Sequence, residues 1–215
     1  MWLPEDYIIK CSQEVDLNKF AGMDCYVGVD LAATSDLTAV AYLVVLDGTY
    51  HFKTHYYLPE SALKDKADKE LYKYWKQQGY LTVTSGNVTD YDYITTDMLR
   101  YADVVNIQSV GYDKYNATQW AIDSTEQGLP LEEYPQTLGN FNMPTRELER
   151  LILSGKAVID NNEINRYCFR NVTLKSDYNG NVKPNKAVDK KKIDGTIAMI
   201  QALGMYLRTP HYTNE

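Results

Sequence analysis

The sequence predicts an α/β protein with a mixed β-sheet, in which an antiparallel three-stranded meander lies beside parallel strands and helices flank the sheet. Three observations predict this fold class. Short apolar runs rich in β-branched and aromatic residues follow one another between residues 25 and 58. From residue 61 onward, helical and strand patterns alternate, which is typical of parallel crossover connections. The length of 215 residues suits one domain.

Three consecutive strands open the domain. The run CYVGVDL at 25–31 is short, apolar and rich in β-formers, which predicts a buried strand. Two further β-patterns, at 37–46 and 49–58, lie on either side of the dipeptide Asp47-Gly48. This dipeptide favours a two-residue hairpin turn, because both central positions of such a turn need positive φ. The three runs therefore predict an antiparallel meander.

Six helices are expected beyond Pro59. Their segments are charged, carry acids in several first turns, and in two cases end at a glycine, Gly79 and Gly155. The last helix has apolar residues at helical spacing along one stripe. The helices are expected at 61–79, 90–103, 116–128, 143–155, 162–171 and 192–208.

Shorter β-patterns lie between these helices. A further hairpin is expected at 172–184, with a tight two-residue turn at Asn179-Gly180. The single strands are expected at 81–86, 104–113, 131–138 and 156–160. The first 22 residues are polar and irregular in pattern, so we expect a linker there. The chain then divides into a linker at 1–22, a domain at 23–209 and a tail at 210–215.

Composition excludes several classes of protein. The 22 basic and 29 acidic side chains give a net charge of −7, so binding to nucleic acid requires a local basic patch. No apolar run approaches the roughly 18–20 residues that span a bilayer, and acids near the N-terminus argue against a secretory signal. The three cysteines, Cys11, Cys25 and Cys168, are odd in number and widely spaced. They predict free thiols in a reducing cytosol.

Three aspartates fall at special positions in this predicted fold. Asp30 lies near the end of the first strand, Asp113 at the end of the 104–113 strand, and Asp194 in the first turn of the last helix. In a sheet of order 3-2-1-4-5 the first and fourth strands are neighbours, and sites form where the strand order switches. Three clustered carboxylates repel one another unless divalent cations such as Mg²⁺ or Mn²⁺ lie between them. Two such ions can promote phosphodiester hydrolysis.

Each aspartate also has a purely structural interpretation. Asp30 could accept hydrogen bonds in a turn, Asp113 could cap the following helix, and Asp194 could complement a helix dipole. Their sequence spacing does not decide between these interpretations. Convergence of all three in one fold favours the metal site.

Four ordered segments together resemble the nuclease domain of the large terminase subunit of tailed bacteriophages. They are GVDLAATSDLTAVAYLV, GYDKYNATQW, KIDGTIAMIQALG, and the stretch from MPTRELERLILSGKAVID through NVKPNKA. The resemblance covers roughly residues 20–208. It implies a ribonuclease H-like fold and a metal-dependent endonuclease that cuts double-stranded DNA concatemers during genome packaging. It also implies that Asp30, Asp113 and Asp194 are catalytic acids that bind two Mg²⁺ or Mn²⁺ ions.

The resemblance further implies partners and a location. The implied partners are double-stranded DNA, the terminase small subunit, the portal and a packaging ATPase domain, with no membrane, in the cytoplasm of the bacterial host. The chain itself has no GxxxxGK segment followed by Ser or Thr, the phosphate-binding loop of such ATPases. We therefore expect an excised nuclease domain or a split subunit, in which residues 2–20 are the remnant of an interdomain linker.

A lysine cluster precedes the last helix and is the clear basic patch of this acidic chain. It is either a solvated loop or a phosphate-binding surface beside Asp194. We expect these lysines to bind DNA: Lys183, Lys186, Lys190, Lys191 and Lys192.

Three alternative functions remain open from the sequence. A sugar-kinase-like or actin-like ATPase also begins with a strand, an aspartate and a meander, but the loop LAATSD lacks the glycines that such a phosphate site needs. Another ribonuclease H-like nuclease, of the transposase or resolvase type, would share the chemistry. A non-catalytic module that docks DNA or the portal would bind without cleaving.

Overall fold

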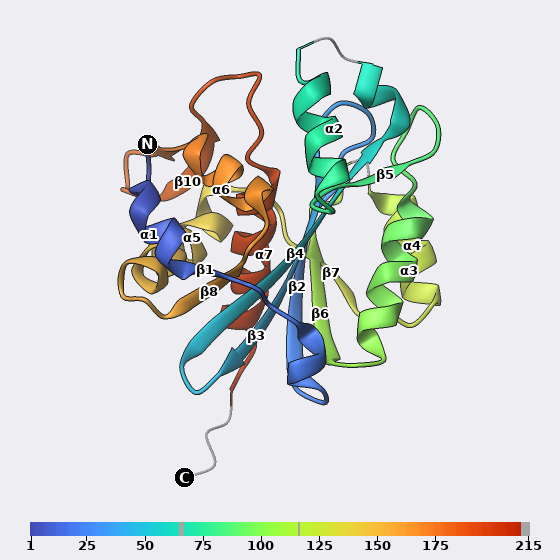
Figure 1. The fold of residues 1–215 in the computed structure, drawn as a ribbon. Coiled ribbons are helices and arrows are strands. Elements are labelled where there is room, and N and C mark those ends of the chain that lie inside the picture. Colours follow the sequence, from blue (N-terminus) through green and yellow to red (C-terminus); the bar gives the residue numbers. More distant parts are fainter. Residues whose placement is uncertain (65–66, 116, 212–215) are drawn as a thin grey trace.

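A central twisted sheet with helices on both faces forms the molecule (Figure 1). The structure is a computed structural model and describes residues 1–64, 67–115 and 117–211. Helices α5, α6 and α7 cover one face of the sheet, and α3 and α4 cover the other (Figure 1). The predicted α/β class with a mixed sheet is confirmed.

Five strands form the centre of the sheet in the order β4-β3-β2-β6-β7, which is the predicted order 3-2-1-4-5. The β2 strand pairs antiparallel with β3 and parallel with β6. The parallel strands β5 and β8 both pair with β4, and β1 adds to β8 at the edge. The strand bounds are β1 Ser12–Gln13, β2 Asp24–Asp30, β3 Thr38–Leu46, β4 Thr49–Pro59, β5 Thr82–Thr84, β6 Asn106–Tyr112, β7 Leu131–Glu133 and β8 Ala157–Asp160.

The helices follow the predicted order, with two differences in their bounds. The predicted helix at 61–79 is a short 3₁₀ helix followed by a separate α-helix. The predicted helix at 143–155 begins five residues earlier. The bounds are α1 Glu5–Cys11, α2 Lys69–Gln77, α3 Tyr91–Ala102, α4 Thr118–Glu126, α5 Leu138–Leu153, α6 Glu163–Arg170 and α7 Asp194–Arg208, with 3₁₀ turns η1 Leu17–Phe20 and η2 Glu60–Lys64.

The early start of α5 has a local explanation. The Thr137 side chain accepts a hydrogen bond from the Asn140 amide and so caps the helix N-terminus. Pro144 lies inside the helix and cannot donate to the Asn140 carbonyl. The Tyr134 hydroxyl donates to that carbonyl instead, at 2.6 Å. A side chain outside the helix thus satisfies the group that proline leaves free.

Residues 1–22 are packed onto the domain, so the irregular segment expected from the sequence is wrong as a description of their structure. They form α1, β1 and η1, and the Trp2 amide donates to the Val172 carbonyl. Their buried apolar side chains include Leu3, Ile8, Val15 and Leu17. A role as linker to a further domain stays a prediction. Of the predicted tail, only residues 210 and 211 are among the described residues.

The two predicted hairpin turns had different outcomes. Asp47 and Gly48 both have positive φ, 51° and 74°, and the flanking residues pair directly, which confirms the two-residue turn. The second hairpin joins β9 (Val172–Ser176) to β10 (Val182–Lys186) through five residues rather than two. Only Gly180 in this loop has positive φ, and the Asp177 carboxylate accepts amide hydrogen bonds within it. The predicted tight turn at Asn179-Gly180 is therefore wrong.

Candidate functional site

The three predicted aspartates lie at the ends of elements that meet at one edge of the sheet. Asp30 is the last residue of β2, Asp113 directly follows β6, and Asp194 is the first residue of α7. Because β2 and β6 are parallel neighbours, their carboxyl ends meet at the same edge. Helix α7 packs against β2 at Gly28, where a side chain would lie within 3.0 Å of backbone atoms of the helix. This close approach brings the start of α7 to the same edge.

Two adjoining cavities contain these carboxylates. The first, which we call the acid cavity, has a volume of about 390 Å³, and its lining includes Asp30, Asp36 and Asp194. The second has a volume of about 270 Å³, and its lining includes Asp30 and Asp113. Asp30 and Gln136 line both cavities. The structure therefore brings Asp30 and Asp194 together directly and places Asp113 on the far side of Asp30.

Asp194 is buried, Asp30 is partly buried, and both favour protonation in the absence of cations. Burial raises the pKa of Asp30 well above its usual range, and the negative charge of Asp194 raises it further. Burial likewise raises the pKa of Asp194 to about 6, with the charge of Asp36 adding to this effect. Two carboxylates that disfavour their charged forms are the environment that a divalent cation stabilises.

Gln136, which the sequence analysis did not single out, connects Asp30 and Asp113. Its side-chain amide donates to Asp30 Oδ1 at 3.2 Å, and its backbone amide donates to Asp113 Oδ2 at 2.9 Å. The other oxygen of Asp113 accepts from the Tyr115 amide at 2.9 Å. Asp113 thus has the turn-capping contacts of its structural interpretation while it also lies beside Asp30. No motif marks Gln136, because its role arises only when the β7–α5 connection reaches this edge.

The donor chemistry fits a hard divalent cation. Asp194 Oδ2 is buried and has no hydrogen-bond partner, so this oxygen is free to act as a ligand. Carboxylate oxygens are the preferred ligands of Mg²⁺ and Mn²⁺. Across the described residues, no three carboxylate, histidine or cysteine side chains are already arranged around one ion position. Gln136 contacts Asp30 through its side chain and Asp113 through its backbone amide.

The five predicted lysines occupy four different environments. The Lys183 ammonium donates to the Gln136 carbonyl, and burial lowers the pKa of Lys183 while the charge of Asp113 opposes this shift. Lys186 lies at 3.6 Å from the Asp36 carboxylate. Lys190 and Lys191 are exposed. These four remain available to contact a ligand at the edge of the sheet.

Lys192 does not fit the exposed DNA-binding role that the sequence predicts. Its residue is 9% exposed, and its ammonium donates to Asp36 Oδ1 at 2.7 Å and to the Ser35 carbonyl at 2.9 Å. All three donor protons of an ammonium are needed to satisfy a buried charge, and two are already used inside the protein. Lys192 is therefore an internal contact of the fold.

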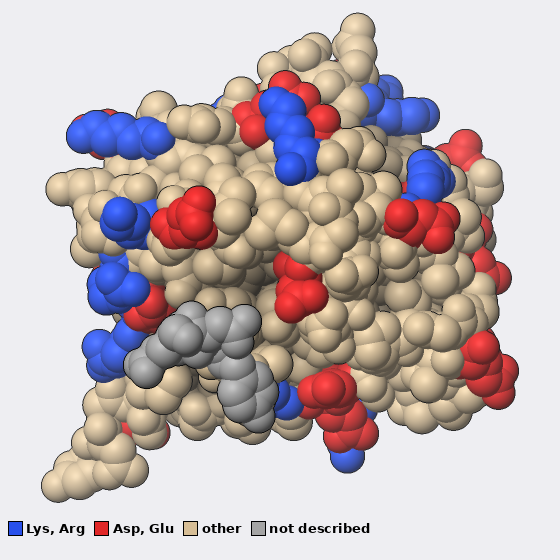
Figure 2. All heavy atoms as spheres, turned by 90° about the horizontal axis from the view of Figure 1, so that it is seen from below, with Lys and Arg blue, Asp and Glu red and all other residues tan. Residues whose placement is uncertain are grey.

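Among the described residues that Figure 2 shows, the opposite end of the molecule has no comparable cluster of lysines. Viewed from below, acidic and basic side chains are scattered across the surface with neutral residues between them (Figure 2). No helix among the described residues has the length and apolar character needed to cross a membrane. A basic surface for a polyanion is therefore absent from this visible face, and the lysines at the carboxylate edge remain the candidates.

Comparison with known proteins identifies the family. The sequence profile described as "Terminase large subunit, endonuclease domain" matches residues 1–209. The chain belongs to this family. Protein YmfN of Escherichia coli K12 is 31% identical over 210 residues, which is 89% of this chain and 45% of that protein. The large terminase nuclease domain thus accounts for nearly the whole chain, and the chain spans less than half the length of this curated relative.

Two solved structures agree with the fold. The crystal structure of the HK97 bacteriophage large terminase matches with a TM-score of 0.84 at 26% identity, covering 94% of this chain and 43% of that chain. The large terminase nuclease from thermophilic phage G20c with bound magnesium matches with a TM-score of 0.56 at 12% identity, covering 84% of this chain and 80% of that chain. The likeness to the G20c nuclease supports the fold and confirms the ribonuclease H-like class.

Proposed function

We propose that this terminase nuclease domain is a metal-dependent endonuclease that cuts double-stranded viral DNA concatemers during genome packaging. Asp30, Asp113 and Asp194 are its catalytic acids and hold two Mg²⁺ or Mn²⁺ ions. The observation that carries the proposal is that the partly buried Asp30 and the buried Asp194 interact in one cavity, where Asp194 Oδ2 has no hydrogen-bond partner. The bound magnesium of the related G20c nuclease supports a divalent cation.

The chain's own residues would prepare the site for phosphodiester hydrolysis. When bound, the cations would activate a water molecule and stabilise the departing 3′ oxygen. Asp30 and Asp194 supply negative charge, and the Gln136 backbone amide orients Asp113 beside them. Lys183 and Lys186 line the acid cavity and would hold the DNA phosphate there.

Exposed lysines would position the duplex without reading its sequence. Lys190 and Lys191 follow the β9–β10 hairpin and precede α7, so they lie in the segment that leads to Asp194. Contacts from lysines to phosphates carry no base information. With a net charge of −7 the isolated chain would bind DNA weakly, and its affinity would fall steeply with salt.

The remaining partners follow from the family. The terminase small subunit, the portal and a packaging ATPase domain would bring the nuclease to DNA in the host cytoplasm, with no membrane involved. A tether to such partners raises the local DNA concentration without new contacts in this domain. Family membership favours the terminase over transposase-type or resolvase-type nucleases and over ATPases. A non-catalytic docking module remains as an outcome of the test below.

The test combines plasmid cleavage with metal binding. Wild-type protein is expected to nick and linearise plasmid DNA in Mn²⁺ or Mg²⁺ and to bind Mn²⁺ in calorimetry. Asp30→Asn, Asp113→Asn and Asp194→Asn should each abolish cleavage, whereas Asp103→Asn, the same change at an exposed position on α3's C-terminal side, should cut normally. DNA binding without cleavage in wild type would favour the docking module. Normal cleavage by Asp113→Asn would show that Asp113 is not a catalytic residue.

A further inference from the structure

The buried Lys192 joins two segments that carry the proposed metal ligands. Its ammonium contacts Asp36 Oδ1 at 2.7 Å and the Ser35 carbonyl at 2.9 Å, across 156 and 157 residues of sequence. Asp36 ends the loop that directly follows Asp30, and Lys192 lies two residues before Asp194. One ion pair therefore spans the two segments from which Asp30 and Asp194 enter the acid cavity.

Other contacts hold each side of this ion pair in place. The Thr38 hydroxyl bonds to both the amide and the carbonyl of Ala32, at 2.9 Å each, and so closes the loop between β2 and β3. On the other side, the Asn171 side chain donates to the Lys192 carbonyl at 3.3 Å. The loop and the start of α7 are thus braced separately, and the pair of Asp36 and Lys192 connects them.

Asp36 has a second, weaker partner. Lys186 lies at 3.6 Å from the same Oδ1 atom, and 31% of its side chain is exposed compared with 11% for Lys192. Burial raises the pKa of Asp36, but the hydrogen bond and charge of Lys192, with the charge of Lys186, lower it overall. Asp36 therefore stays ionised between two ammonium groups, although it lines the same cavity as three other carboxylates, Asp30, Asp189 and Asp194.

We propose that Asp36 and Lys192 form a latch that holds Asp30 and Asp194 at the separation a divalent cation requires, and that Lys186 is the exchangeable partner that moves from Asp36 to a DNA phosphate. Both are positioning roles and rest on the proposed function. The Lys192 ammonium is largely buried and also contacts the Ser35 carbonyl, so it holds the half-exposed Asp36 carboxylate firmly, whereas a lysine that is 31% exposed and lies at 3.6 Å can leave at little cost. When Lys186 leaves, Lys192 still neutralises Asp36.

The alternative role for Asp36 is that of a further metal ligand. Its position in the acid cavity is compatible with this role, but its carboxylate is already engaged by two ammonium groups. A ligand role would require both contacts to loosen and would leave Lys192 as a buried charge without its partner, which is strongly unfavourable. The latch needs no such rearrangement.

The experiment compares the two lysines that share one carboxylate. Lys192→Met, Asp36→Asn, their double variant, Lys192→Arg and the control Lys186→Met are each measured for Mn²⁺ affinity by calorimetry, for urea unfolding in EDTA, and for kcat and KM of plasmid nicking. Lys192→Met and Asp36→Asn should each weaken Mn²⁺ binding about tenfold or more, as loss of residues that orient metal ligands does. The double variant should be no worse than either single variant, because both changes break the same contact. Lys192→Arg should restore most of the affinity.

Lys186→Met should behave differently from Lys192→Met. Its Mn²⁺ affinity should stay within about twofold of wild type, while its KM for DNA rises and its salt slope falls by roughly 1. Urea unfolding in EDTA identifies variants that have lost the fold. If Lys192→Met or Asp36→Asn is unfolded, the Mn²⁺ affinities of Lys192→Arg and Lys186→Met are compared instead.

Four results would overturn the latch. Equal effects of Lys192→Met and Lys186→Met on Mn²⁺ affinity would remove the distinction between the two lysines. Loss of metal binding in Asp36→Asn with none in Lys192→Met would make Asp36 a ligand. Absence of Mn²⁺ binding in wild type would overturn both the latch and the proposed function, whereas Mn²⁺ binding in wild type and in Lys192→Met alike would overturn the latch alone.

Discussion

The face of the sheet beneath α7 is packed with apolar side chains and glycines, whereas the face beneath α3 and α4 includes a network of polar contacts. Helix α7 is buried on every side from Asp194 to Met205. Gly28 on β2, Gly111 on β6 and Gly204 on α7 each leave no room for a Cβ. Apolar packing at such short range leaves few alternative positions for the helix.

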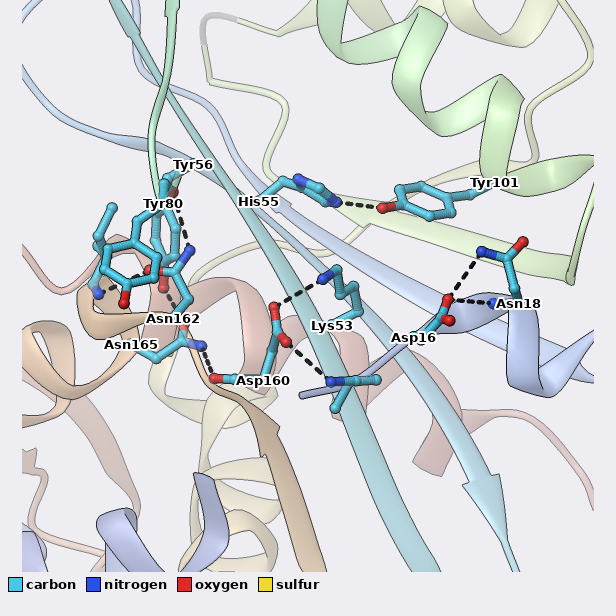
Figure 3. A network of polar contacts seen from close by, with 12 residues as sticks. Asp16, Asn18, Lys53, His55, Tyr56, Tyr80, Tyr101, Asp160, Asn162 and Asn165 are labelled. Atoms are coloured by element: carbon cyan, nitrogen blue, oxygen red, sulfur yellow. Dashed lines mark hydrogen bonds and ion pairs between the residues drawn. The ribbon is translucent and has the colours of Figure 1, made fainter. Parts of the chain in front are cut away.

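On the opposite face, specific polar contacts join β4 to α3. His55 Nε2 lies 2.6 Å from the Tyr101 hydroxyl, and the Tyr57 hydroxyl donates to Asp97 at 2.7 Å. At the edge of this face Lys53 pairs with Asp160 at 3.2 Å (Figure 3). The α3 helix is amphipathic and partly exposed, in contrast to α7.

This difference shows how the fold serves the candidate site. Asp194 begins α7, so its position is set by the packing of the entire helix on the sheet. The α3 and α4 face contributes none of the three aspartates, and there the chain can accommodate buried hydroxyl and imidazole groups. Four substitutions test this contrast between the two faces.

Gly28→Ala should cause the largest loss of stability. The new Cβ would lie within 3.0 Å of Ala198 O and Ala202 N, which are backbone atoms of α7 and cannot move without shifting the helix. We expect the free energy of unfolding to fall by about 3 kcal/mol or more in urea denaturation. Gly111→Ala is the matched control, because its Cβ would meet the flexible Met205 side chain, and it should lose roughly 1 kcal/mol. Equal losses would show that α7 is not fixed at Gly28.

Stability should fall in acid because of His55 on the opposite face. Burial lowers the pKa of His55 to about 4, and the positive charge of Lys53 adds to this shift. An unfolded histidine has a pKa near ~6.5, so the unfolded state takes up the proton first. This contribution is fully present above about pH 6.5 and is lost as the pH falls toward about 4, by roughly 3 kcal/mol.

The measurement compares urea unfolding of wild type and His55→Gln between pH 7 and pH 4 in EDTA. Carboxylates titrate in both proteins, so the difference between the two curves isolates His55. A constant difference across this range would contradict the assigned pKa shift. As the pH falls from 7 to 4, the free energy of unfolding should decrease more in wild type than in His55→Gln.

Asp194→Asn should stabilise the metal-free protein while it abolishes cleavage. The pKa of Asp194 is raised to about 6, so its stabilising contribution is present below the unfolded value of 3.8 and is lost as the pH rises through about 6. At pH 7 in EDTA the ionised carboxylate is therefore unfavourable, and its removal should gain roughly 1–2 kcal/mol. The check is thermal and urea unfolding with Asp103→Asn as the control. Destabilisation by Asp194→Asn would indicate that its charge is already compensated.

The smallest expected difference in stability is between variants of two adjacent β4 tyrosines, whose side chains point to opposite faces of the sheet. The Tyr56 hydroxyl donates to the side chain of Asn165, which is 1% exposed, whereas Tyr57 donates to Asp97, which also pairs with Arg100. Tyr56→Phe leaves a buried acceptor without a donor, and Tyr57→Phe does not. Tyr56→Phe should therefore be less stable than Tyr57→Phe by about 1 kcal/mol in urea unfolding. The reverse order would show that the polar face is the less tolerant of the two.

Local patterns in the sequence were sufficient for the central strands and for the positions of the aspartates. The apolar run at Asp24–Asp30 and the turn at Asp47-Gly48 each depend on residues that are neighbours in the chain. The strand order also followed, because short connections restrict which strands can pair. Asp30 and Asp194 consequently lie at the ends of the elements where they were expected.

Local patterns were misleading where distant residues supply the contacts. Residues 1–22 are irregular in pattern yet buried against the domain, since α1 packs on α5, α6 and β8. Further along, Val15, Leu17 and Phe20 join the apolar cluster beneath α3. The stripe predicted for the last helix is only part of its buried surface, because the sheet and α5 and α6 enclose the helix together.

Local sequence patterns were enough to predict the mixed α/β fold, its strand order and the edge at which Asp30, Asp113 and Asp194 meet. Tertiary structure alone decided how those carboxylates are held. Gln136 reaches Asp30 across 106 residues, and Lys192 reaches Asp36 across 156. The physical reason is that periodicity records which face of an element is apolar, whereas the partner of a polar side chain is set by contacts that exist only after the elements pack. A lysine in a basic run thus became an internal ion pair.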